Sequence, residues 1–324
     1  MKLILSLMLA TLCLFVSSSL NAKPTQCDPA KATKIERSTF EGQRFSVHIE
    51  GPSKGDVDDV ILIPGLASPR DVWSTTVAAK SGCIRIHAVQ IRGFGDDAQI
   101  NADGPVLDPF IKELADYIAQ HIVAKNGKKP AIIGHSMGGL SALIMAARYP
   151  DRVGKVMVVD ALPFIGTLFN PAATVELVRP QAERMAASIR SSYGQPAPKD
   201  TGTDPGPQSQ AGRLTNTAEG RILVDRWSRN SDSRVIAQVL LDVMTTDLRP
   251  ELPKITAPVT LLYAQDDSAM TVEQSTAAFI PQYAGTPNFK AVQITGSYHF
   301  ITLDQPEKFG AELDLFLDKK PEGK

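Results

Sequence analysis

The sequence Ala131-Ile132-Ile133-Gly134-His135-Ser136-Met137-Gly138-Gly139-Leu140 carries the strongest indication of the fold. Its first three residues are apolar and two of them are β-branched, which predicts a short buried strand. The next five match the elbow pattern G-x-S-x-G, in which a serine lies on a strained turn between a strand and a helix. An apolar segment over 140–148 follows. The stretch therefore predicts strand, tight turn and helix, with Ser136 at the turn.

Each position of this pattern has a physical reason. Small residues two before and two after Ser136 let the backbone turn without clashes. The helix that follows presents free backbone N–H groups and a partial positive charge, and both suit an oxyanion. The pattern also occurs by chance, so an ordinary glycine-rich turn between a strand and a helix is the alternative interpretation.

Strands and helices alternate on both sides of this stretch. Such alternation with continuous apolar strands predicts an α/β fold, a mainly parallel sheet with helices on both faces. Strands are expected at Arg44–Glu50, Val60–Ile63, Ile84–Ile91, Ala131–Ile133, Val153–Val159, Pro258–Tyr263 and Phe289–Ile294, and helices at Pro109–Lys125, Leu140–Arg148 and Gln305–Leu317.

One region has no strand pattern, from Asp160 to about Ser233. We expect an inserted helical cap over about 161–233, with helices around Thr174–Ser191 and Thr217–Arg229. The centre of this region, Gly194–Gly212, is rich in Gly, Pro, Ser and Thr. Such composition has few apolar groups to offset the entropy of ordering, so we expect this centre to be mobile. A tolerated surface loop is the alternative.

Along nearly its whole length after residue 22, the chain resembles the α/β-hydrolase superfamily, and most closely the cap-bearing bacterial serine esterases. The resemblance implies a nucleophile, an acid and a histidine in that order along the chain. Ser136 is then the nucleophile. His299, in Gly296-Ser297-Tyr298-His299-Phe300 after the last expected strand, is the base. Two acids follow the strand that ends at Tyr263, and the family spacing selects Asp267, with Asp266 as the alternative.

The resemblance also implies two backbone donors for an oxyanion. One is the N–H of Met137, and the other is the N–H of Leu66 in the loop Pro64-Gly65-Leu66-Ala67-Ser68. The family commonly has His-Gly where this chain has Pro64-Gly65, a change that keeps a backbone donor available. A family-like turn at 92–96 carries Gln90 in place of the usual leading Asp, and we interpret this turn as structural.

These residues predict a serine hydrolase that cleaves carboxylic esters through an acyl-enzyme intermediate. A lactonase, an amidase, a cofactor-free haloperoxidase-like enzyme and a non-catalytic binding protein of the same fold stay open as alternatives. The sequence has no H-E-x-x-H pair and no Cys/His cluster, so we expect no metal and no cofactor. The net charge of −1 gives no reason to expect nucleic acid, and the expected partner is a small-molecule ester.

An acyl pocket could be lined by residues of the expected cap and its surroundings. Plain core packing is the alternative for the aromatic residues among them. The candidates are Phe164, Phe169, Leu177, Val178, Met185, Tyr193, Trp227 and Phe300.

The first 22 residues have the pattern of a secretory signal peptide. Lys2 precedes the apolar run Leu3–Val16, and small residues lead to Ala22. We therefore expect export to the periplasm or the medium, a hydrolase domain over 23–324, and no membrane span after cleavage. A buried N-terminal helix and a lipoprotein cysteine at Cys13 are weaker alternatives.

Two cysteines follow the expected cleavage site, Cys27 and Cys83. An oxidising compartment permits a disulfide between them. Two separate thiols are an equally weighted alternative.

Overall fold

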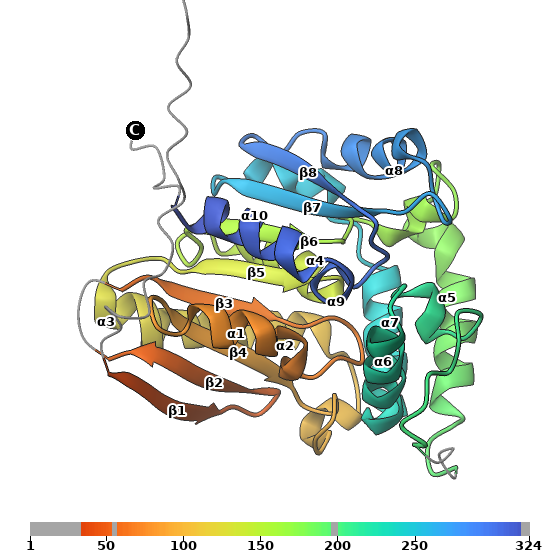
Figure 1. The fold of residues 1–324 in the computed structure, drawn as a ribbon, viewed down its shortest axis with the longest axis horizontal. Helices are drawn as coiled ribbons and strands as arrows, with labels where there is room; N and C mark the ends of the chain where they lie inside the picture. The colour runs from red at the N-terminus through yellow and green to blue at the C-terminus, as the bar shows by residue number, and fades with distance from the viewer. Residues whose placement is uncertain (1–33, 54–56, 196–199, 319–324) are drawn as a thin grey trace, which may run out of the picture.

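A computed structural model describes residues 34–53, 57–195 and 200–318 of the 324-residue chain. One eight-stranded sheet runs through it in the order β1-β2-β4-β3-β5-β6-β7-β8 (Figure 1). The strands are β1 (Ile35–Glu41), β2 (Phe45–Pro52), β3 (Asp59–Ile63), β4 (Arg85–Ile91), β5 (Ala131–His135), β6 (Lys155–Val159), β7 (Val259–Gln265) and β8 (Phe289–Thr295).

The sheet is parallel from β4 to β8 and antiparallel at one edge. β3 pairs in parallel with β4 and β5, and β5, β6, β7 and β8 continue the parallel order. Only β1 with β2 and β2 with β4 pair antiparallel. The predicted mainly parallel α/β fold is confirmed. The polar sequence of β1, largely exposed along the edge of the sheet, gave no strand pattern.

Helices cover both faces of the sheet (Figure 1). One apolar core lies between the sheet and α2, α4, α7 and α8, and the other lies beneath η2, α9 and α10. The helices are η2 (Arg70–Trp73), α1 (Ser74–Lys80), η3 (Gln99–Ala102), α2 (Leu107–Ile118), η4 (Ala119–Val123, a π-helix), α3 (Ala124–Asn126), α4 (Met137–Arg148), η5 (Ile165–Leu168), α5 (Val175–Arg190), η6 (Ala211–Arg213), α6 (Ala218–Asn230), α7 (Ser233–Met244), η7 (Arg249–Lys254), α8 (Val272–Phe279), η8 (Ile280–Tyr283), α9 (Ile301–Asp304) and α10 (Pro306–Asp318).

The segment between β6 and β7 is helical, as expected, and lies beyond one end of the strands (Figure 1). Both expected helices are present as α5 and α6. The segment extends past position 233, because α7 and η7 precede β7. Val235 and Val239 of α7 belong to the main core, so this helix joins the segment to the sheet domain. A cap inserted into the hydrolase domain at about 161–233 stays a prediction.

The stretch Gly194–Gly212 is better supported than its composition suggests, in the part that the structure describes. Asp200 pairs with Arg226 and Asp204 with Arg221 of α6, and Ala211 is buried in the second core. A mobile centre of the region stays a prediction.

The predictions for the N-terminus concern residues outside the described ranges: the signal peptide at 1–22, Cys13 and Cys27. Cys83 is disulfide-bonded, and its partner is not among the described residues. No helix in the described ranges is both long and apolar enough to cross a bilayer.

Candidate active site

Ser136 lies between β5 and α4 with a strained backbone. Its φ is 54° and its ψ is −120°, a region that non-glycine residues rarely adopt. Such a conformation costs about 1–3 kcal/mol and persists only where the surroundings enforce it. Ser136 N–H donates to the Val159 carbonyl of β6, and its own carbonyl accepts from Gly139 and Leu140 of α4. The strand and the helix together hold the turn.

The two glycines of the pattern make the close approach of strand and helix possible. A Cβ on Gly134 would lie 2.0 Å from the Gly138 oxygen. A Cβ on Gly138 would lie 2.3 Å from the Ile63 oxygen of β3. Neither distance is compatible with a side chain, so both positions require glycine. The sequence pattern thus corresponds to real contacts.

His299 meets a carboxylate, and that carboxylate is Asp160. Its Nδ1 lies 2.7 Å from Asp160 Oδ2. The other carboxylate oxygen, Oδ1, accepts from the Ala264 N–H at 2.8 Å, so Asp160 is oriented at both oxygens. Asp160 is buried, and 28% of the His299 side chain is exposed. With a proton on Nδ1, Nε2 carries the lone pair that can accept a proton.

The prediction that Asp267 pairs with His299 is wrong. Asp267 is exposed, and its Oδ1 accepts from Gln265 Nε2 of its own loop at 2.8 Å. The alternative, Asp266, accepts from the Ser268 N–H at 3.0 Å, and the hydrogen bonds from Ser268 lower the pKa of Asp266. The loop after β7 folds back at the bridge between Asp266 and Met270, and Asp266 Oδ2 also accepts from Asn216 Nδ2 at 3.4 Å.

The family spacing points to the acids after β7, whereas Asp160 directly follows β6. The sequence does contain a signal for Asp160, because this acid directly follows the apolar run Val156–Val159. β6 is the neighbour of β5 in the sheet, so an acid at its end lies beside the elbow. Asp160 also has a φ of 50°, a second strained residue at this edge.

His135, between Gly134 and Ser136, contacts the loop that carries His299. Its Nε2 lies 3.0 Å from the His299 carbonyl oxygen, to which it donates, and the two rings are 4.6 Å apart. His135 is fully buried. Burial, followed by the charge of a protonated His299, lowers the pKa of His135 well below its usual range. His135 is therefore neutral, and it joins the elbow to the loop of His299.

The loop after β3 lies against the elbow, where the two expected oxyanion donors are found. A Cβ on Gly65 would lie 3.2 Å from Ser136 Cβ, so this backbone passes directly beside the serine. Ala67 has a φ of 54°. In the described part of the chain, neither the Leu66 nor the Met137 N–H donates to a protein acceptor. Both remain available as the predicted donors.

Gln90, in place of the family's Asp, links this loop to the turn at 92–96. Its Oε1 accepts from the Arg70 N–H at 2.9 Å, and its Nε2 donates to the Phe94 carbonyl. Arg70 follows the oxyanion loop by two residues. The turn that we interpreted as structural thus braces the loop that carries Leu66.

The expected acyl-pocket residues divide between interior and surface. Phe164, Val178, Trp227 and Phe300 are buried, with Val178 packed in a small cluster with Phe164. Leu177 is 66% exposed and Met185 38% exposed, and Phe169 and Tyr193 are exposed as well. Of the set, Phe300 lies at the site, because its ring contacts those of His135 and His299.

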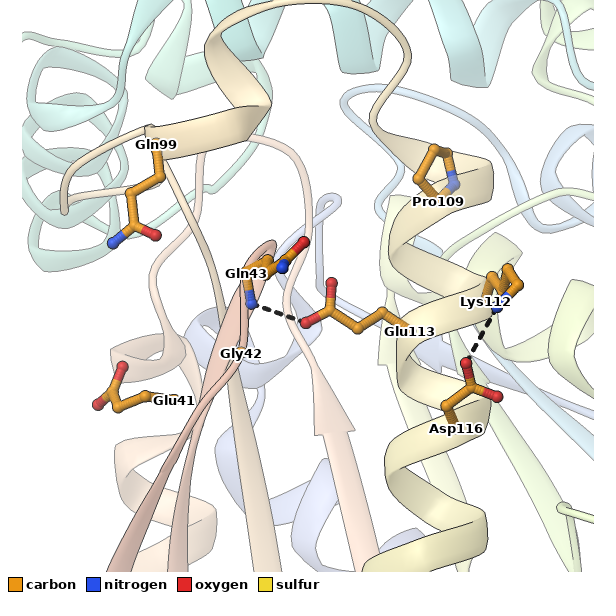
Figure 2. Close-up of a pocket in the computed structure, with 8 residues that line it drawn as sticks. All are labelled: Glu41, Gly42, Gln43, Gln99, Pro109, Lys112, Glu113 and Asp116. Atoms are coloured by element: carbon orange, nitrogen blue, oxygen red, sulfur yellow. Dashed lines mark hydrogen bonds and ion pairs between the residues drawn. The ribbon is translucent and has the colours of Figure 1, made fainter.

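A surface hollow of about 570 Å³ lies elsewhere, between the turn after β1 and α2 (Figure 2). Its carboxylates are engaged: Glu113 accepts from the Gln43 N–H and Asp116 pairs with Lys112. None of the site residues lines it. Within the described ranges no cluster of three or more His, Cys, Asp or Glu side chains is placed to bind a metal ion.

Known proteins share this fold. A pimeloyl-[acyl-carrier protein] methyl ester esterase of Vibrio atlanticus is 24% identical over 272 residues, which are 82% of this chain and 96% of that protein. An esterase of Thermogutta terrifontis superposes with a TM-score of 0.65 at 19% identity, covering 88% of this chain and 98% of the other. An enol-lactonase of Burkholderia xenovorans superposes with a TM-score of 0.62 at 20% identity, covering 85% and 97%.

A family model described as the alpha/beta hydrolase fold matches residues 59–306, most of the chain. That range contains the strained serine turn, the oxyanion loop and the paired histidine and aspartate. The chain belongs to the α/β-hydrolase family and is an enzyme of the hydrolase class.

Proposed function

We propose that this enzyme hydrolyses carboxylic esters through an acyl-enzyme, with Ser136, His299 and Asp160 as the catalytic residues. The observation that carries the proposal is the 2.7 Å pair of His299 Nδ1 and Asp160 Oδ2 next to the strained serine turn. An esterase among the similar proteins supports the ester as the substrate class.

In the first half-reaction Ser136 Oγ attacks the carbonyl carbon of the ester, and His299 Nε2 takes the hydroxyl proton. Asp160 stabilises the imidazolium through Nδ1. The Leu66 and Met137 N–H groups stabilise the oxyanion, each by about 3 kcal/mol. The C–O bond breaks, and the proton passes from His299 to the leaving alcohol. Water, deprotonated by His299, then releases the acid and restores Ser136.

The proposal is tested with p-nitrophenyl esters of increasing chain length, assayed beside lactones and amides. The wild-type enzyme should hydrolyse the esters fastest, and Ser136→Ala should lose nearly all of that activity while it unfolds at the same denaturant concentration. If the enzyme turned over lactones or amides faster, these would be its substrate class and not carboxylic esters. Ester hydrolysis by Ser136→Ala at the wild-type rate would remove the mechanism.

We also propose that the enzyme is exported. The pattern of residues 1–22 supports export, and so does a disulfide at Cys83, because disulfides persist in oxidising compartments. Mass spectrometry of the secreted or periplasmic protein without reductant should show a chain that begins at Lys23 and a peptide linking Cys27 to Cys83. An intact N-terminus with two free thiols would contradict both parts.

A further inference from the structure

A buried carboxylate near the site has no role in the mechanism above. Asp304 ends α9, five residues after His299, and is 8% exposed. Among the described residues, its hydrogen-bond donors are neutral hydroxyl and backbone N–H groups. Burial raises the pKa of Asp304, and these hydrogen bonds partly offset that rise. Burying a carboxylate without hydrogen-bond donors would cost free energy of folding. The positions of the donors to Asp304 therefore show which parts of the chain it links.

The donors come from two parts of the chain. Tyr298 N–H, directly before His299, donates to Asp304 Oδ2 at 2.8 Å. From the segment before α6, Thr215 Oγ1 donates to Asp304 Oδ1 at 2.5 Å and the Asn216 N–H donates to it at 3.1 Å. Asp304 therefore joins the histidine loop to the helical insertion.

The segment Leu214–Asn216, which we call the cap brace, holds the histidine loop at two further points. The Phe300 N–H donates to the Leu214 carbonyl at 3.0 Å, and Asn216 Nδ2 donates to the Gly296 carbonyl at 3.0 Å. Together with the contact through Asp304, the brace is attached before and after His299.

An aromatic contact also joins α6 to the residues around His299. Trp227 of α6 packs 6.2 Å from Phe300, whose ring meets His299 edge-on at 5.6 Å. Thr215 is completely buried, and a Cβ on Gly220 of α6 would lie 2.2 Å from its hydroxyl. The start of α6 is therefore packed tightly onto the brace.

We propose that Asp304 and the cap brace are positioning elements that hold His299 in register with Ser136 and Asp160, so that the helical insertion takes part in catalysis without touching the reacting atoms. This inference rests on the proposed function. Proton transfer needs His299 within hydrogen-bond reach of both partners, and misplacement by about 1 Å can cost about 100-fold in rate. Loosening the brace should lower kcat and leave KM nearly unchanged.

The test removes one hydrogen bond from the buried brace. Thr215→Val deletes the hydroxyl that donates to Asp304 and keeps the shape of the side chain. The matched control is Thr302→Val in α9, where a buried hydroxyl has no hydrogen-bond partner among the described residues. Thr215→Ser restores the donor. All are assayed on p-nitrophenyl butyrate at 25 °C, with the rate of fluorophosphonate labelling as a second readout.

We expect Thr215→Val to lower kcat and the labelling rate about tenfold with KM within about twofold, since a modest displacement costs part of the 100-fold penalty. Thr302→Val and Thr215→Ser should stay close to wild type. Unchanged kcat for a folded Thr215→Val enzyme would overturn the proposal, as would an equal loss in Thr302→Val. If Thr215→Val does not fold, Asn216→Ala, at a half-exposed position, must show the same fall in kcat.

Ser136→Ala, assayed in parallel, separates the two proposals. If it is inactive and Thr215→Val is unaffected, the brace fails and the proposed function stands. If Ser136→Ala retains activity, the proposed function itself fails.

Discussion

Asp160 has both of its carboxylate oxygens engaged, one by the His299 ring and one by the Ala264 N–H. A carboxylate fixed in this way keeps the imidazole in one tautomer and one orientation, which is what the base of a serine hydrolase requires. Asp267 makes only a local contact with Gln265. At the scale of single residues, the two acids thus have separable roles.

We expect Asp160→Asn to lower kcat/KM about 10³–10⁴-fold on p-nitrophenyl butyrate, because an amide cannot hold the imidazolium. Asp267→Asn should stay within about threefold of wild type, because its carboxylate faces its own loop. Steady-state kinetics of the two variants decide the assignment. A larger loss in Asp267→Asn would return the acid to the end of β7.

His135 should make the protein acid-sensitive. Its folded-state pKa is depressed by burial, so below about pH 6.5 the unfolded chain binds a proton that the folded chain does not. Stability from this residue is present above pH 6.5 and is lost as the pH falls, by about 1.4 kcal/mol per pH unit. Denaturant unfolding at several pH values measures the slope.

In His135→Asn the slope of the free energy of unfolding against pH should be smaller by about 1.4 kcal/mol per pH unit, which corresponds to one proton, because the titrating group is gone. His48→Asn, at an exposed position, serves as the control and should change the slope less. Parallel stability–pH curves for wild type and His135→Asn would show that His135 is protonated equally in both states.

At the scale of elements, the apolar patterns of the sequence predict the positions of buried strands and helices. They do not predict elements that are exposed or short. β5, β6, α4 and α10 lie where the sequence predicted them. β1 is an exposed edge strand and α8 is short, so neither has a clear periodic pattern. The cap brace has no regular structure at all. Its position depends on hydrogen bonds to residues 80–90 positions away, which no local pattern reports.

Glycine substitutions test the packing of two helices. Gly138→Ala should destabilise the fold by at least about 1–3 kcal/mol, because its Cβ would enter the van der Waals radius of the Ile63 oxygen. Gly310→Ala, in α10 with nothing within 4 Å of the added Cβ, should stabilise by about 0.5–1 kcal/mol. Urea unfolding compares the two. Equal effects would mean that the elbow helix can move away from β3.

At the scale of the molecule, the topology explains why the sequence pointed to Ser136 and His299 but not to the carboxylate that pairs with His299. The strands β5, β6 and β8 are parallel, so their carboxyl ends lie on the same side of the sheet. Ser136 follows the end of β5, Asp160 follows that of β6, and His299 lies in the loop after β8. The serine has a local pattern and the histidine follows the last strand. The acid can follow either β6 or β7, and only the direction of each side chain separates the two.

The insertion between β6 and β7 lies beyond these carboxyl ends of the strands (Figure 1). It starts at Ala161, directly after the acid, and returns through the cap brace to the loop of His299. The three residues that we propose as catalytic therefore lie between the ends of the strands and the insertion.

The central claim is that Ser136 forms a covalent intermediate, and trapping it is the most direct test. Wild-type enzyme treated with a fluorophosphonate should gain the mass of one adduct, and peptide mapping should place it on Ser136 as ester hydrolysis falls to zero. Ser136→Ala should not react. Complete labelling of another residue, or undiminished hydrolysis by an enzyme labelled at Ser136, would contradict the account.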